Sequence, residues 1–216
     1  MTGVESFLLR RRLARQGWAM QTFAYSSLRE PLEKVIQRGA RRALQLAQET
    51  SAPVHLLGHS LGGLVICRMF EQGLLDFEHF QSNQCRVVLM GSPLQGSQSG
   101  RQLHRLGNGL LLGESTDELS QPHRMGDEQR RWTFGPQLGV IAGSMPVGLG
   151  RLLGSLPEPN DGTVSLLETH IDGATDRCLV SATHTGLLTS VEAAHQVNAF
   201  LEHGRFEGVL RQVESL

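Results

Sequence analysis

Hydrophobic positions along the chain follow two spacings, one typical of helices and one typical of buried strands. Apolar residues that recur every three or four positions predict amphipathic helices, and short continuous apolar runs predict strands that are covered on both faces. The predicted helices span residues 4–16, 31–50, 61–72 and 191–201. The predicted strands span residues 18–25, 54–57, 86–90, 138–143 and 177–182. This alternation predicts a three-layer α/β fold, in which helices cover both faces of a mostly parallel sheet.

The first two predicted elements carry specific expectations. In the helix of residues 4–16, three apolar side chains are expected to share the buried side: Phe7, Leu8 and Leu13. Three basic side chains of the same helix are expected to stay in solvent: Arg10, Arg11 and Arg15. Residues 18–25 alternate between apolar and polar positions, and this period of two predicts a strand.

Two stretches lack a clear period. Residues 95–134 are predicted to form helices and loops over the edge of the sheet, and residues 144–163 form a loop rich in glycine and proline. We find no linker and no internal repeat, so residues 1–216 are expected to form a single domain. The apolar side chains of Leu110 and Leu111 lie within residues 95–134, where they are candidates for a lid or an acyl pocket. Ordinary core packing explains these leucines equally well.

The strongest chemical signal is the segment Gly-His-Ser-Leu-Gly-Gly of residues 58–63, which lies directly between a predicted strand and a predicted helix. This is the context of a nucleophile elbow, where a serine on a strained turn projects its hydroxyl from the top of the sheet. Side chains at Gly58 and Gly62 would collide with neighbouring backbone. The N–H of Leu61, at the start of the helix, is placed to stabilise an oxyanion. The alternative is a plain turn with a capping serine.

A serine nucleophile needs a base, and the base needs an acid that orients it. In a fold with this elbow, the expected chain order is serine, then Asp or Glu, then His. His184 follows the last predicted strand and is the candidate base. Asp161, in an Asn-Asp-Gly-Thr-Val segment, is the candidate acid, with Glu158 and Asp172 as reserves. His59 adjoins Ser60 and is expected to line the site.

The segments GHSLGG, PNDGTVS and THTGLL, in this order, resemble those of the α/β-hydrolase superfamily, and more narrowly those of small lipase- and esterase-like bacterial hydrolases. The resemblance extends over essentially the whole chain. It implies that Ser60 is the nucleophile, Asp161 the acid and His184 the base. It also implies acyl-ester chemistry without a metal or an organic cofactor. The candidate residues of the substrate pocket are His59, Leu94, Leu110 and Leu111.

The N-terminal end departs from the pattern of this family. In the family, a strand that ends in His-Gly precedes the first helix, lies beside the elbow strand and supplies a second oxyanion N–H. This chain enters its first helix within a few residues of Met1. We therefore expect the natural protein to start further upstream. Otherwise the two neighbours of the absent strand keep unpaired backbone groups unless they close up or pair with another chain, and the lost oxyanion donor costs about 10²–10³ in rate.

Composition excludes several classes of function. The 20 Lys and Arg nearly balance the 21 Asp and Glu, and aromatic residues make up 5%, which argues against a nucleic-acid-binding protein. No apolar run approaches the roughly 18 residues of a membrane span. The three cysteines are Cys67, Cys85 and Cys178, an odd number at wide spacing that suggests neither a disulfide framework nor a metal site. Reduced thiols and the lack of a signal-peptide pattern favour the cytoplasm.

Together these features predict a serine hydrolase that cleaves a small ester or lipid-like molecule through an acyl-enzyme. Thioesters, amides and transfer of the acyl group to an alcohol are alternatives, because the same three residues serve all of these reactions. A different class is a hydrolase fold without catalysis that is retained for binding, and the absent strand is its support. Turnover of an ester distinguishes the two classes.

Overall fold

The computed structural model describes residues 6–26, 30–75, 80, 85–96, 131–147 and 156–208. Its strands are β1 (Leu56–His59), β2 (Arg86–Met90), β3 (Gln137–Gly143) and β4 (Asp176–Val180). Its helices are α1 (Phe7–Arg15), α2 (Leu32–Glu49), α3 (Leu61–Glu71) and α8 (Val191–His203), with the 3₁₀ turns η2 (Leu167–Thr169) and η3 (Gly186–Leu188). Most of residues 95–134, including Leu110 and Leu111, lie outside the described residues. The division into domains stays a prediction.

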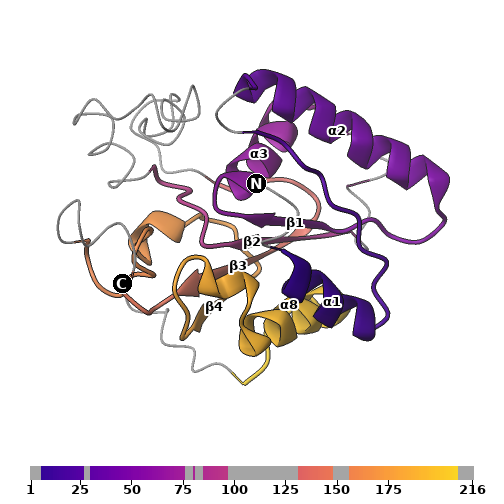
Figure 1. Ribbon diagram of the computed structural model, residues 1–216. Helices are drawn as coiled ribbons and strands as arrows, with labels where there is room; N and C mark the ends of the chain where they lie inside the picture. Colours follow the sequence, from indigo (N-terminus) through magenta and orange to yellow (C-terminus); the bar gives the residue numbers. More distant parts are fainter. Residues whose placement is uncertain are drawn as a thin grey trace.

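The four strands form one parallel sheet in the order β1-β2-β3-β4. Figure 1 shows α2 and α3 on one face of this sheet and α1 and α8 on the other. Each face has its own core cluster of buried apolar side chains, one shared with α2 and α3 and one with α1 and α8. The predicted three-layer α/β fold with a mostly parallel sheet is therefore confirmed. β1 begins two residues later than predicted and includes Gly58 and His59.

Helix boundaries follow the local chemistry of the sequence. On α2, Val35, Ile36 and Ala40 are buried, whereas Glu33 and Lys34 on the opposite side are exposed. At the start of α8, the Ser190 hydroxyl accepts the N–H of Ala193, and the helix ends at Gly204 with a left-handed φ of 69°. None of the helices in the described ranges is both long and apolar enough to cross a membrane.

The buried side of α1 differs from the prediction. Leu9 and Leu13 are buried, one turn apart, whereas Phe7 and Leu8 are 56% and 40% exposed. The prediction was therefore wrong for Phe7 and Leu8. The helix begins at Phe7, and the stripe that faces α8 passes through positions 9 and 13, four residues apart. Two of the three arginines, Arg11 and Arg15, are exposed as expected, but Arg10 is half-buried.

Residues 18–25 do not form a strand, so this prediction was also wrong. The segment has no regular secondary structure, and no described strand pairs with it. Its alternation has a different cause: Trp18 and Met20 pack into the cluster of α1 and α8, and Phe23 and Tyr25 into the cluster of α2 and α3. Residues 20–23 and Tyr25 share with β1 the lining of a cavity of about 250 Å³.

The elbow strand β1 lies at the edge of the described sheet. The N–H of Ser60 donates to the carbonyl of Met90 on β2 (2.9 Å). Because alternate residues of a strand point to opposite edges, the backbone groups of Leu57 and His59 face away from β2, towards the cavity. No other described strand pairs with them. β1 and residues 18–25, which line the same cavity, do not pair with each other in a ladder.

Candidate active site

Ser60 stands on a sharp turn between β1 and α3. Its φ of 54° makes it the one non-glycine residue with a positive φ in the described part of the chain. Such a backbone conformation is strained for any residue with a side chain and is typical of the serine of a nucleophile elbow. Since α3 begins at Leu61, the N–H of Leu61 has no acceptor within the helix and lies at the positive end of the helix dipole.

Glycines make this turn possible, although not all in the expected way. A Cβ on Gly58 would lie 2.7 Å from the backbone nitrogen of Gly63, so the predicted collision at Gly58 is confirmed. The collision predicted at Gly62 is not found, because a Cβ there would meet only the Tyr25 hydroxyl, at 3.7 Å. The second close approach is at Gly63, whose Cβ would lie 2.0 Å from Oγ of Ser92.

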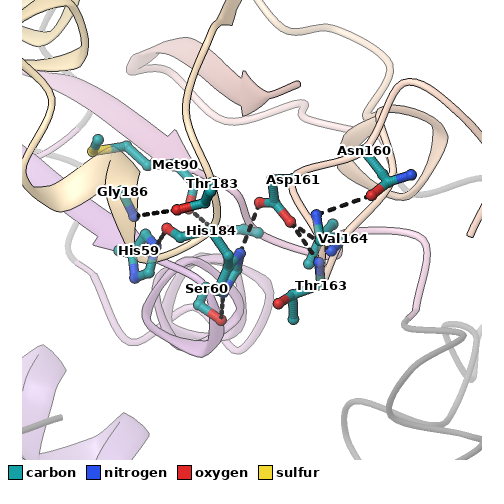
Figure 2. A network of polar contacts seen from close by, with 12 residues as sticks. His59, Ser60, Met90, Asn160, Asp161, Thr163, Val164, Thr183, His184 and Gly186 are labelled. Atoms are coloured by element: carbon teal, nitrogen blue, oxygen red, sulfur yellow. Dashed lines mark hydrogen bonds and ion pairs between the residues drawn. The ribbon is translucent and has the colours of Figure 1, made fainter. Parts of the chain in front are cut away.

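The structure brings Ser60, His184 and Asp161 together in one chain of hydrogen bonds (Figure 2). Oγ of Ser60 lies 2.9 Å from Nε2 of His184, and Nδ1 of His184 lies 2.7 Å from Oδ2 of Asp161. Ser60 follows β1, and His184 follows β4. In parallel sheets, these carboxyl ends of strands are where binding sites form.

The order of acceptors and donors fixes the tautomer of His184. The carboxylate of Asp161 only accepts, so Nδ1 of His184 carries the proton and donates it. This leaves the lone pair of Nε2 free to accept the Ser60 hydroxyl. The arrangement is that of a hydroxyl next to a base whose ring is oriented by a carboxylate.

The loop around Asp161 holds the carboxylate firmly. Asp161 is 1% exposed, and its Oδ1 accepts the N–H groups of Thr163 (2.9 Å) and Val164 (2.7 Å). The backbone N–H of Asp161 donates to the carbonyl of Val164 (3.0 Å). Nearby, Oε2 of the buried Glu168 accepts the N–H of Ser165 (2.7 Å). Backbone donors therefore stabilise the buried charge, as a site of this kind requires.

Two glycines that sequence reasoning missed lie directly against Asp161 and His184. A Cβ on Gly91 would lie 3.1 Å from Oδ2 of Asp161 and 3.3 Å from Nδ1 of His184. A Cβ on Gly143 would lie 2.7 Å from Cβ of Asp161. The available signal was their place in the sequence, because Gly91 directly follows β2 and Gly143 ends β3.

His59 lines the cavity beside β1, and its place in a substrate pocket stays a prediction. Its Nε2–H donates to the backbone carbonyl of His184 (2.9 Å). Burial first, and then the neighbouring His184, lower the pKa of His59 to about 4. The ring is therefore neutral at neutral pH.

The other candidate residues lie away from the Ser60–His184 contact. Asp172 lies 3.0 Å from Nε2 of His170, and Glu158 is exposed in the segment before Asp161. Leu94 is 2% exposed and packs in the core cluster of α2 and α3, so it does not line the cavity beside β1. Within the described ranges, no group of three or more His, Cys, Asp or Glu side chains is placed to hold a metal ion.

No protein-family model matches this chain, and no curated protein matches it by sequence. Solved structures do resemble it. One is the mature form of the lipase BlEst2 from Bacillus licheniformis, with a TM-score of 0.57 and 15% identity over 80% of this chain and 74% of the lipase. The chain has an α/β-hydrolase fold.

Two further structures share the hydrolase fold. The first is a candidate thioesterase from Silicibacter sp., with a TM-score of 0.52 and 19% identity over 84% of this chain and 62% of that protein. The second is the phospholipase PlaB from Legionella pneumophila, with a TM-score of 0.52 and 17% identity over 79% of this chain and 42% of the phospholipase. At these identities the likeness concerns the hydrolase fold alone.

Proposed function

We propose that this protein is a serine hydrolase that cleaves carboxylic esters of small, lipid-like molecules. The observation that carries the proposal is the continuous chain of hydrogen bonds from Ser60 through His184 to the buried Asp161, at 2.9 and 2.7 Å. The strained φ of Ser60 supports it further, because strain in a folded protein concentrates at functional sites. The neighbours of the same fold include a lipase and a phospholipase.

In the proposed mechanism, Nε2 of His184 takes the proton of the Ser60 hydroxyl while Oγ attacks the ester carbonyl. The bond from Oγ to the carbonyl carbon forms, and the N–H of Leu61 stabilises the oxygen that becomes negative. His184 then gives its proton to the leaving alcohol as the ester bond breaks, which leaves an acyl group on Ser60. Asp161 holds the ring in the right tautomer and stabilises its positive charge.

Deacylation repeats the same steps with water. His184 takes a proton from water, the hydroxide oxygen attacks the acyl carbonyl, and Ser60 leaves with the proton that His184 returns. No step in this mechanism requires a metal or an organic cofactor. The reaction centre is an acyl carbonyl, so thioesters fit the same steps with a thiol as the leaving group.

Hydrolysis of p-nitrophenyl esters of short and medium acyl chains tests the proposal. We expect turnover by the wild-type protein and loss of nearly all of it in Ser60→Ala. A matched control is Ser51→Ala, because Ser51 is an exposed serine in the turn before β1. Full activity in Ser60→Ala would contradict the proposal. A folded wild-type protein without any turnover of esters or thioesters would favour a binding role for this fold instead.

The location in the cell and the binding partners stay predictions. Cys67, Cys85 and Cys178 are buried and form no disulfide with one another, and burial raises the pKa of the Cys85 thiol to about 12. We propose a cytoplasmic protein whose partner is its small-molecule substrate.

A further inference from the structure

His59 is the residue between Gly58 and the candidate nucleophile, and its side chain reaches the other candidate catalytic loop. The ring is only 7% exposed. It lies against the ring of His184, with 4.8 Å between the centroids and an angle of 43° between the planes. Figure 2 shows His59 and Asp161 in contact with His184 at different points, while Ser60 approaches its Nε2. His59 therefore connects the elbow strand with the loop that follows β4.

The contact between His59 and His184 is a hydrogen bond whose direction is fixed. Nε2 of His59 lies 2.9 Å from the backbone carbonyl oxygen of His184. A carbonyl oxygen only accepts, so the proton of neutral His59 must be on Nε2. Nδ1 of His59 then carries a lone pair, and it is buried without a hydrogen-bond partner among the described residues.

This geometry keeps His59 neutral beside a base that gains charge during the reaction. A second proton would go to Nδ1, where no described acceptor receives it. The pKa of His59 is accordingly lowered to about 4, first by burial and then by His184, against the opposing influence of its hydrogen bond and of Asp161. His59 thus donates one hydrogen bond to the catalytic loop without adding a competing charge.

The backbone of His184 is held from two sides. Its N–H donates to the carbonyl of Asp161 (2.8 Å), and its carbonyl accepts Nε2–H of His59 (2.9 Å). The hydrogen bonds to Asp161 restrain the ring and the peptide before it, whereas His59 restrains the peptide after it. Loss of the His59 contact would leave the loop free to move on that side, away from Ser60.

We propose that His59 is a positioning residue, whose hydrogen bond to the carbonyl of His184 sets the distance between the imidazole and Ser60. This inference rests on the proposed serine hydrolase function. His59 is not assigned a contact with the substrate or with Oγ of Ser60. Its effect therefore belongs in kcat rather than in KM, because it acts on the geometry of the reacting groups.

Two substitutions separate the hydrogen bond from the bulk of the side chain. His59→Leu removes the donor but keeps an apolar side chain, whereas His59→Gln keeps an N–H donor on a side chain of similar reach. A loss of position of about 1 Å lowers rates by roughly 10²-fold, so we expect His59→Leu to lower kcat by about 10–100-fold. KM should stay nearly unchanged, and His59→Gln should recover most of the lost kcat.

His55 provides a matched control. It is the other histidine beside β1, its pKa is also lowered to about 4 by burial, and its Nδ1 accepts the N–H of Arg86 (3.0 Å). The substitution His55→Leu removes this hydrogen bond to the Arg86 backbone, a bond that does not involve His184. We expect His55→Leu to lower thermal stability but to keep the kcat of the wild type at a temperature where it is folded.

A second readout does not depend on turnover. In proton NMR, Nδ1–H of His184 in its hydrogen bond to Asp161 should give a low-field signal, which His184→Gln identifies by its loss. We expect this signal in the wild type, in His55→Leu and in His59→Gln, and broadening or loss of it in His59→Leu. If His59→Leu does not fold, His59→Asn replaces it, because the shorter amide does not reach the carbonyl.

The outcomes distinguish this inference from the proposed function. Wild-type kcat and an unchanged His184 signal in His59→Leu would overturn the positioning role while the hydrolase function stands. Equal losses of kcat in His59→Gln and His59→Leu would also overturn it. Absence of turnover in the wild type, together with a His184 signal that depends on His59, would overturn the hydrolase function and leave the structural contact supported.

Discussion

Around β3 the sheet packs against α8 without space for one further carbon atom, whereas along the free edge of β1 a cavity of about 250 Å³ remains. A Cβ on Gly139 of β3 would lie 2.8 Å from ring atoms of both Phe200 and Phe206. On β1, the backbone groups of Leu57 and His59 face the cavity and have no described strand beside them.

This difference divides the candidate catalytic residues between two environments. Asp161 and His184 follow β3 and β4 in the closely packed region, where several hydrogen bonds and two glycines fix their positions. Ser60 follows β1, the edge strand of the described sheet, which adjoins the cavity. The candidate acid and base, Asp161 and His184, are therefore positioned by several independent contacts. The bond from His59 to His184 is one of the links between the two environments.

The largest expected effect is a loss of folding stability at acidic pH, and it arises at His59, the last residue of β1. The folded protein protonates His59 only near its lowered pKa of about 4, whereas the unfolded chain protonates it near 6.5. The unfolded state thus binds more protons between these values, and stability is lost as the pH falls from 6.5 towards 4. For His59 the loss at pH 4 is on the order of 3 kcal/mol.

Urea unfolding at pH 7 and pH 4.5 checks this prediction in the wild type and in His59→Gln. The carboxylates titrate in both proteins, so the difference between the two pH dependences isolates His59. We expect a smaller loss of stability in the variant. An equal loss in both proteins would mean that His59 is not held in its neutral form.

The next effect is a loss of activity from a substitution at Gly91, which lies against Asp161 and His184. In Gly91→Ala, the new Cβ would press on Asp161 and His184, and we expect kcat to fall about 10²-fold. Gly73→Ala is the matched control, because Gly73 has a similar positive φ (66° against 53°) but nothing within 4 Å of its Cβ position. We expect Gly73→Ala to keep the kcat of the wild type. An equal fall of kcat in both variants would mean that backbone strain, not displacement of Asp161 and His184, lowers the activity.

A smaller effect is expected from overpacking beside α8. Gly139→Ala should lower the free energy of unfolding by about 1–3 kcal/mol, because Phe200 and Phe206 must move to admit the methyl group. Thermal and urea unfolding measure this loss. An unchanged midpoint would show that this region contains more space than the contacts at Gly139 indicate.

The smallest expected effect is an increase in stability, from a substitution that fills part of the cavity beside β1. Ala43 of α2 lines the cavity beside β1, and leucine is a good helix former whose added carbons would be buried there. We expect Ala43→Leu to raise the free energy of unfolding by up to about 1 kcal/mol. A loss as large as that of Gly139→Ala would remove the contrast between the two regions.

Much of the fold could be predicted from the spacing of apolar residues, because buried parallel strands and amphipathic helices leave clear periods. The prediction was wrong for residues 18–25 because alternation has two causes. Trp18 and Met20 pack into one core cluster and Phe23 and Tyr25 into the other, so apolar and polar positions alternate here without a partner strand. Local sequence cannot distinguish the two cases, since the difference lies in what stands beside the segment.

The candidate site, like the fold, could be predicted from the sequence only in part. Order along the chain and the predicted strand ends selected Ser60, Asp161 and His184 as candidates, and the structure brings these three side chains together. The supporting groups were not visible in that order. Gly91, Gly143 and the bond from His59 to the His184 carbonyl depend on segments that meet only in three dimensions.

The most direct test of the central claim is the reaction of the folded protein with a fluorophosphonate probe, read by intact mass. The claim is that His184 and Asp161 activate Ser60. It predicts one adduct per wild-type molecule, none on Ser60→Ala, and much slower labelling of His184→Gln than of the wild type. An adduct that persists in Ser60→Ala, or a folded wild-type protein that stays unlabelled, would contradict it.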